Sequence, residues 1–194
     1  MPTPARTSVE EIVSAGSSIL DDAGLAGLTM QAVAARVGVR PPSLYKRVRD
    51  RDELLRLIAA ATAQDLGARL DAATAEAGPA SPTPAERLLH LAHALRTFAH
   101  TWPERYRLLF TPPAAAHRPD PDAQARSVTA LLDTTARLVG PDDALSAART
   151  VTAWATGFIS MEFAGAFQLG GDVDAAYAYG ISRIAAALAD ETAT

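Results

Sequence analysis

The chain has 194 residues, of which 48% are hydrophobic and 21% are charged, and its formal net charge is −4. This composition is typical of a globular protein and excludes an intrinsically disordered chain. Because the sequence contains no cysteine, it also excludes disulfide bonds, cysteine-ligated zinc and thiol nucleophiles.

Helical periodicity dominates the sequence, whereas strand signals are weak, so we expect an all-α fold. The first predicted helix begins after Ser8, which can form a capping box with Glu11, and it ends near Gly27. Thr29 is the expected N-cap of a short second helix. Gly38 ends that helix, because glycine accepts a left-handed backbone.

Two prolines start the next short helix, which we expect to begin at Pro41 or Pro42 and to run through Val48. Asp50, with Glu53 in the capping-box position, predicts the start of a long helix. The rest of the chain predicts a linker and a proline-rich loop between further helices. We expect the long helix at 51–77, the linker at 78–86, the loop at 111–122, and helices at 84–100, 102–110, 122–139, 142–169 and 172–189.

Basic residues are concentrated in one part of this acidic chain. Residues 28–56 hold seven cations and three acids, a balance of +4, so the remainder of the chain carries −8. A local basic island of this kind indicates an anionic partner at one place. A solvated helix face with mixed charges is the alternative explanation.

The spacing inside this island is typical of a helix-turn-helix. Ala34 allows the two helices to cross closely, Gly38 takes the turn conformation, and Leu44 buries the second helix against the first. Such a second helix places its N-terminal residues at base edges in the major groove, while flanking cations lie on phosphates. An ordinary pair of helices with charged outer faces remains the alternative.

The segment LTMQAVAARVGVRPPSLYKRVRDRDELL resembles the DNA-binding domain of the TetR family of transcriptional regulators. The similarity rests on a Thr-capped helix, a Gly-Val turn, a Leu-Tyr pair in the short helix, and a cap that is followed by Leu-Leu. The matching residues are Thr29, Gly38, Val39, Leu44, Tyr45, Val48, Asp50, Leu54 and Leu55.

This resemblance implies a three-helix helix-turn-helix DNA-binding domain over residues 1–57. A long helix would join it to a helical ligand-binding and dimerisation domain over residues 58–194. The resemblance also implies which side chains contact DNA. These residues are Gln31, Arg40, Pro41, Ser43, Tyr45, Lys46, Arg47 and Arg51.

The segment AWATGFISMEFAGAF is similar to one C-terminal type of the family, marked by a Trp, a His-Gly pair and a Glu. The matching residues here are Trp154, Gly157 and Glu162, and Thr156 stands in place of the histidine. The last two predicted helices are rich in Ala and Gly, which permits close packing and a four-helix interface in a homodimer. Packing within one chain is the alternative, and the resemblance favours the dimer.

Large aromatic residues gather on the predicted helices after residue 84. They would either bury one another in a core or line an apolar cavity for a small ligand, and the sequence leaves both open. Glu162 is expected to face such a cavity, a partner or solvent. The predicted ligand-binding residues are Phe98, Trp102, Tyr106, Trp154, Phe158, Met161 and Glu162.

Other chemistry finds little support in the sequence. His90 and His93 lie three residues apart, but no carboxylate completes a metal site with them, so we interpret these residues, His100 and His117 as structural or surface side chains. The sequence has no Gly-rich phosphate loop and no Gly-x-Ser-x-Gly motif. We therefore expect neither an enzyme nor a bound metal or cofactor.

The leading interpretation is a ligand-responsive, homodimeric repressor that a small apolar or aromatic effector releases from palindromic double-stranded DNA. The alternative is an all-α small-molecule binding protein without a DNA role. The N-terminus lacks the apolar run of a signal peptide. The sequence also contains no run of about 18 apolar residues, the length that a membrane-spanning helix needs. We therefore expect a cytoplasmic protein without a membrane partner.

Overall fold

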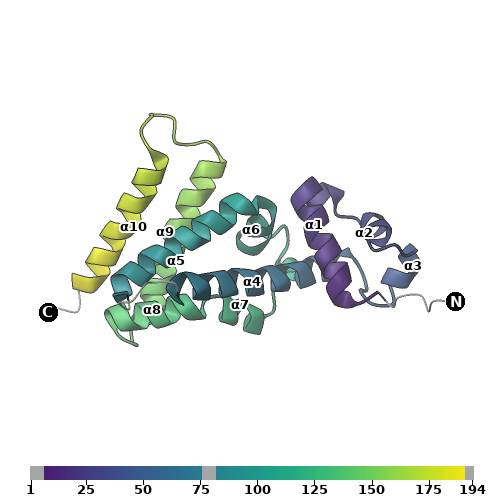
Figure 1. Cartoon of the computed structure of the whole chain (residues 1–194), viewed down its shortest axis with the longest axis horizontal. Coiled ribbons are helices and arrows are strands. Elements are labelled where there is room, and N and C mark those ends of the chain that lie inside the picture. Colours follow the sequence, from purple (N-terminus) through teal and green to yellow (C-terminus); the bar gives the residue numbers. More distant parts are fainter. Residues whose placement is uncertain (1–6, 76–81, 191–194) are drawn as a thin grey trace. The chain divides into compact units, whose positions relative to one another are not determined.

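The computed structural model describes residues 7–75 and 82–190, which fold into helices joined by turns and loops and contain no strand (Figure 1). The predicted all-α class is confirmed. None of the helices within these ranges combines the length and apolar character that a membrane crossing needs. The elements are α1 (Val9–Gly27), α2 (Met30–Arg36), α3 (Pro41–Leu44), α4 (Arg51–Ala75), α5 (Pro84–Thr101), α6 (Pro103–Phe110), the 3-10 helix η1 (Ala115–His117), α7 (Pro121–Ser127), α8 (Thr129–Val139), α9 (Ala144–Phe163) and α10 (Val173–Asp190).

The chain divides into two compact units. Unit 1 comprises the chain up to Asp65 together with Thr101–Gln124, and unit 2 comprises Leu66–His100 and the chain from Ala125 onward. The boundary predicted between residues 57 and 58 falls inside α4, within unit 1, and the functional division placed there stays a prediction. Part of the linker predicted at 78–86 lies outside the described residues.

The helix starts of unit 1 follow the predicted capping pattern. Glu11 N–H donates to Ser8 Oγ over 3.1 Å, and Ser8 N–H donates to the Glu11 carboxylate over 2.9 Å, which completes a capping box. At α4, Glu53 N–H donates to the Asp50 carboxylate over 2.8 Å. The Glu53 carboxylate accepts from the Arg49 N–H, one residue earlier than in a capping box.

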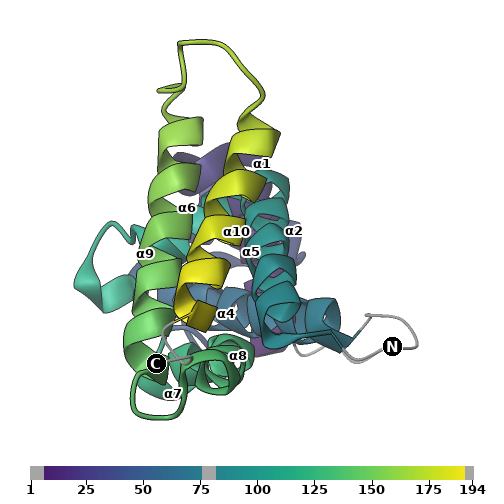
Figure 2. The ribbon, with the colours of Figure 1, turned by 90° about the vertical axis from the view of Figure 1, so that its left-hand side faces the viewer.

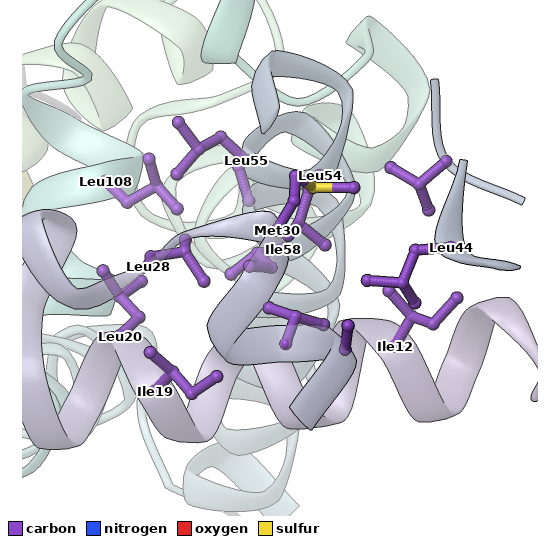
Figure 3. Packing of buried hydrophobic residues seen from close by; sticks show 14 residues of the cluster. Ile12, Ile19, Leu20, Leu28, Met30, Leu44, Leu54, Leu55, Ile58 and Leu108 are labelled. Atoms are coloured by element: carbon purple, nitrogen blue, oxygen red, sulfur yellow. The ribbon is translucent and has the colours of Figure 1, made fainter. Parts of the chain in front are cut away.

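One hydrophobic cluster holds unit 1 together (Figure 3). Ile12 of α1 and Leu44 of α3 lie next to each other in this cluster, and both are completely buried. Leu108 of α6 lies in the same cluster, on the side of Leu28 and Leu55. Helix α6 is therefore part of the core that supports the helix-turn-helix, which the sequence did not predict.

Two of the predicted helices differ from expectation, one in its end and one in its continuity. The single helix predicted at 142–169 ends at Phe163, because Gly165 takes a left-handed φ of +62° and stops it. The helix predicted at 122–139 is interrupted at Val128, so it forms two shorter helices, α7 and α8.

In unit 2, α9 and α10 run side by side as a helical hairpin (Figure 2). The Trp154 ring of α9 lies against Tyr177 of α10, with ring centroids 5.0 Å apart. A Cβ at Gly180 would lie 2.3 Å from the Trp154 ring, so glycine permits this close packing. The Tyr177 hydroxyl donates to the Ala92 carbonyl over 2.9 Å, which joins α10 to α5.

Candidate nucleic-acid interface

The turn between α2 and α3 has the geometry predicted from the sequence. Thr29 caps α2, because its Oγ1 accepts a hydrogen bond from the Ala32 N–H over 3.1 Å. Gly38 has a φ of +71°, and a Cβ there would meet nothing within 4 Å, so the left-handed backbone and not a lack of space favours glycine. Val39 N–H donates to the Ala34 carbonyl over 2.9 Å and closes the turn.

Helix α3 starts where the sequence predicts but is shorter. It begins at Pro41 and ends at Leu44, and turn residues follow up to Arg47, where the prediction continued the helix to Val48. Leu44 and Val48 are both completely buried, so they anchor the two ends of this segment in the core of unit 1. Tyr45 lies between these anchors and is 53% exposed, which places its ring outside the core.

The residues predicted to contact DNA come from α2, α3 and the segments that follow each of them, and most of them face solvent. Pro41 and Arg51 are half-buried. The exposed members are Gln31, Arg40, Ser43, Tyr45, Lys46 and Arg47.

The seven cations of the basic island separate into three groups. Arg36, Arg49 and Arg56 pair with carboxylates at distances from 2.9 to 3.7 Å. Arg51 donates to backbone carbonyls. Within the part of the chain that the structure describes, no ion pair holds the remaining three cations, which are exposed and available to an anionic partner. These free cations are Arg40, Lys46 and Arg47.

Arg51, the first residue of α4, has its guanidinium turned toward the protein. Its Nε donates to the Leu28 carbonyl over 2.7 Å, and its Nη2 donates to the Leu25 carbonyl over 2.6 Å. Because α1 ends at Gly27, helical N–H groups are not available to these carbonyls. The Arg51 side chain therefore completes the hydrogen bonding at the end of α1.

The predicted ligand-binding residues are divided between the two units. Trp102 and Tyr106 belong to unit 1, where the Arg105 guanidinium lies 5.9 Å from the centroid of the Trp102 ring and burial raises the pKa of Tyr106. The remaining members belong to unit 2 and are Phe98, Trp154, Phe158, Met161 and Glu162.

Unit 2 brings Trp154 and Phe158 together with Tyr177 in an aromatic cluster. The ring centroids of Trp154 and Phe158 are 5.7 Å apart, and Phe158 lies 5.1 Å from Tyr177. Phe98 is almost completely buried, whereas Met161 is 48% exposed. These residues do not share one environment, and their role in ligand binding stays a prediction.

Glu162, on the mostly apolar α9, faces Arg96 of α5. Arg96 Nε donates to Glu162 Oε2 over 2.9 Å, and Nη2 donates to Oε1 over 2.6 Å. Arg96 Nη2 also donates to Asp174 of α10 over 2.5 Å, and His100 Nε2 lies 3.4 Å from the Glu162 carboxylate. Burial alone raises the pKa of Glu162, but the hydrogen bond and charge of Arg96, then those of His100, outweigh burial and lower it.

Arg96 was not predicted from the sequence. The sequence does hold a signal for this residue. Arg96 is a cation on a helix whose core face is apolar, and the apolar α9 carries one isolated carboxylate that could pair with it. Such a pair predicts a contact between two distant segments, because a buried charge needs a partner of opposite sign.

A small apolar cavity of about 40 Å³ lies within unit 2. Its walls come from α4, α5, α8 and α9, and none of the predicted ligand-binding residues contributes to them. Pockets for drug-sized ligands measure about 300–1,000 Å³, so this cavity in its present shape takes only a much smaller guest. The lining residues are Leu70, Leu91, Ala92, Leu95, Leu131, Val151, Thr152 and Ala155.

Two family profiles match the chain. The profile for bacterial regulatory proteins of the tetR family matches residues 12–58, which include the turn and α3. The profile for the tetracyclin repressor-like C-terminal domain matches residues 88–184, half of the chain. The chain belongs to the TetR family.

Similar proteins extend this relationship over nearly the whole sequence. An HTH-type transcriptional regulator of Mycobacterium tuberculosis, Rv0681, is 28% identical over 191 residues, covering 97% of this chain and 85% of the relative. The crystal structure of a regulatory protein, SCO4313, matches with a TM-score of 0.73 and 26% identity over 91% of this chain and 94% of that chain. Streptomyces coelicolor ActR in complex with (S)-DNPA matches with a TM-score of 0.70 and 18% identity over 95% and 98%, which supports the fold alone.

This TetR-family protein is therefore a transcriptional regulator and not an enzyme. The Trp/His-Gly character of its C-terminal region stays a prediction. At the position of the expected histidine, Thr156 Oγ1 donates to the Thr152 carbonyl over 2.7 Å. In residues 7–75 and 82–190, no three His, Asp or Glu side chains gather in a way that could hold a metal ion.

Proposed function

We propose that this TetR-family regulator binds a palindromic double-stranded operator as a homodimer and represses transcription until a small apolar or aromatic effector releases it. The free cations Arg40, Lys46 and Arg47 carry the proposal, because they lie around α3 while the other cations of the island are engaged within the protein. Exposed cations that neutralise phosphates supply much of the affinity of a protein for DNA.

The residues of the interface have different proposed roles on the DNA. Tyr45 and Lys46 lie at base edges in the major groove, where hydrogen bonds and apolar contacts distinguish base pairs. Arg40 and Arg47 hold phosphates and fix the register of α3. Gln31, Pro41 and Ser43 complete the contact surface, as the resemblance to the family implies.

The proposed dimer uses the outer faces of α9 and α10. Gly157, in the middle of α9, is exposed, and a Cβ there would meet nothing within 4 Å. A glycine inside an exposed helix costs about 1 kcal/mol relative to alanine, and packing within the protomer gives no reason for it. A second helix that crosses close to α9 supplies that reason. Ala153, one turn before it on α9, and Ala164, the residue that follows the last turn of α9, are also exposed.

The proposed effector site lies within unit 2, where the apolar cavity would enlarge around an apolar ligand. A ligand shifts the balance between DNA-bound and free shapes only if its affinity for the two shapes differs.

Ala155→Leu tests the site, because a larger side chain fills the cavity. We expect the variant to bind less 1-anilinonaphthalene-8-sulfonate, an anionic dye whose aromatic rings enter apolar sites, while its helical circular dichroism stays that of the wild type. Equal dye binding by the two proteins would place the effector site elsewhere.

The DNA-binding function is tested by selection from a pool of random duplexes, followed by titration of the selected duplex and of a shuffled duplex with the same composition. We expect the wild-type protein to enrich a palindrome and to bind it more tightly than the shuffled duplex. A typical specific complex is about 10³–10⁷ times tighter than the non-specific one. Failure to enrich any sequence would contradict the proposal.

A further inference from the structure

We infer that Arg51 is a positioning residue for DNA recognition: its guanidinium fixes the helix-turn-helix between α1 and α4. This inference rests on the proposed function, because it concerns the orientation of the helix that would meet DNA. It differs from the direct contact with DNA that the family resemblance implies for this residue.

The hydrogen bonds of Arg51 connect two ends of the recognition module. The module, α2, the turn and α3, spans residues 30–44. Leu28 precedes the module in the sequence, and its carbonyl accepts a hydrogen bond from Arg51 Nε. Arg51, the first residue of α4, follows the module. One guanidinium therefore joins the segment before the module to the first residue of the helix after it.

The carbonyls that Arg51 reaches belong to an irregular part of the chain. Helix α1 is broken at Gly24, where φ is +64°, and it ends three residues later. Leu25 and Leu28 lie in this irregular segment, and the Leu28 side chain is completely buried in the cluster of unit 1. Because the planar fork of an arginine holds two acceptors at once, Arg51 fixes a segment that regular helical hydrogen bonds leave loose.

The position of the side chain also agrees with this role. Arg51 is half-buried and uses Nε and Nη2 to bind carbonyls at 2.7 and 2.6 Å. In contrast to Arg51, the free cations Arg40, Lys46 and Arg47 are exposed to solvent. We therefore assign the phosphate contacts to Arg40 and Arg47, and we assign to Arg51 the orientation in which α3 and its following turn present Tyr45 and Lys46 to base edges.

The first test needs no DNA and compares Arg51→Lys with Arg56→Lys. Lysine keeps the positive charge but lacks the planar fork. Arg56 is a half-exposed arginine of the same helix whose carboxylate partner lies 3.7 Å away, so it serves as the matched control. We expect Arg51→Lys to speed amide hydrogen exchange across residues 25–44 while the helices of unit 2 keep their protection. Arg56→Lys should leave both unchanged.

The second test titrates both variants with the duplex that the wild-type protein selects and with its shuffled counterpart, at several salt concentrations. We expect Arg51→Lys to bind the selected duplex about 5- to 150-fold more weakly, the range for one displaced base contact. The slope of log affinity against log salt should stay that of the wild type, because every contact to phosphate remains in place.

Each outcome decides between the roles. Tight binding of the selected duplex by Arg51→Lys, or unchanged exchange across residues 25–44, overturns the inference. If Arg51 held a phosphate, Arg51→Gln would lower the salt slope by about 0.9 for each phosphate no longer neutralised, and this result would also overturn the inference. A variant without helical circular dichroism at the temperature of measurement assigns Arg51 to folding alone, which would also overturn the inference. Equal binding of both duplexes by the wild type contradicts the proposed function, and hydrogen exchange then still decides the role of Arg51.

Discussion

Lys46 and Arg47 are neighbours in the sequence, both are exposed, and within the described residues no ion pair holds either of them, yet we assign them different partners on DNA. The difference is measurable, because a contact to a base edge changes the preference for one sequence, whereas a contact to phosphate changes affinity for all sequences alike.

Replacing Lys46 by Ala should reduce the preference for the selected over the shuffled duplex by about 1–3 kcal/mol. Replacing Arg47 by Ala should weaken both complexes to the same extent and lower the salt slope by about 0.9 for each phosphate that the arginine neutralises in the wild type. Titrations of labelled duplexes at several salt concentrations measure both quantities. Identical profiles for the two variants would show that the roles are not divided in this way.

Glu162 gives unit 2 a pH-dependent contribution to stability. Because Arg96 lowers its pKa in the folded protein below the ordinary value of 4.5, the unfolded state binds a proton more readily. The stabilisation is present above pH 4.5 and is lost as the pH falls through the lowered pKa. Asp174 shares Arg96, whose hydrogen bond and charge lower the pKa of that carboxylate as well.

We expect the thermal midpoint of Glu162→Gln to fall less than that of the wild type when the pH is lowered from above 4.5 to below the lowered pKa. Circular dichroism at a series of pH values measures this difference. Glu86→Gln is a comparison outside this ion pair: hydrogen bonds from Thr83 also lower the pKa of this exposed carboxylate at the start of α5, so its removal should flatten the profile in the same direction. A Glu162→Gln profile parallel to that of the wild type would contradict the assigned ion pair.

At the scale of whole elements, α6 shows where prediction from sequence reaches its limit. The positions of α2 and α3 could be predicted, because Thr29, Gly38 and Leu44 act within a few residues of one another. Leu108 joins the same core from α6, and nothing in the local pattern of that helix indicates which part of the chain it covers. A hydrophobic face shows that a helix is buried but does not identify its neighbour.

Helix α6 is held to α1 by charge as well as by apolar contact. Arg105 Nε donates to the Asp21 carboxylate over 2.9 Å, and the two side chains are 20% and 25% exposed. Together with Leu108, this pair makes α6 a structural support of the helix-turn-helix. We therefore expect changes in α6 to affect unit 1 even though α6 lies far from α3 in the sequence.

Leu108→Ala tests this support. The leucine is 1% exposed, and replacing a buried leucine by alanine destabilises a protein by about 2–5 kcal/mol. The measurement is chemical denaturation followed by circular dichroism. Leu169→Ala, at a fully exposed leucine in the segment between α9 and α10, should stay within about 0.5 kcal/mol of the wild type. A Leu108→Ala protein as stable as this control would remove α6 from the core.

The candidate site could be predicted only in part, because some of its contacts join residues that lie far apart in the sequence. The resemblance to the family implied the residues of the DNA-binding segment, and most of them are exposed in the structure. The contacts of Arg51 and Arg96 were not predicted. Arg51 binds carbonyls 23 and 26 positions away in the sequence, and Arg96 binds carboxylates 66 and 78 positions away. The two caps at Ser8 and Asp50 were predicted because capping is decided within three residues.

At the scale of the whole molecule, the proposed repression requires two protomers to pair, because a palindrome presents two half-sites about one helical turn or more apart. Ala185 of α10 is 2% exposed within one chain, so an acidic residue there would disturb the protomer itself. Ala164 at the end of α9 is exposed and is the better position for testing the interface.

We expect Ala164→Asp to sediment as a monomer at micromolar concentration with unchanged helical circular dichroism, because an unpaired charge buried between two chains is costly. Ala125→Asp, at an exposed alanine of α7, is the matched control and should remain dimeric. Analytical ultracentrifugation measures both. A wild-type protein that sediments as a monomer under the same conditions would refute the dimer.

The central claim is that the free cations around α3 bring a dimer of this protein to specific DNA. The most direct test is a fluorescence anisotropy titration of the wild-type protein with a labelled copy of the duplex it selects. We predict saturation at two protomers per duplex, an affinity that falls linearly on a log–log plot as salt rises, and weaker binding of the shuffled duplex. Equal affinity for both duplexes, or no saturable binding at physiological salt, would contradict the claim.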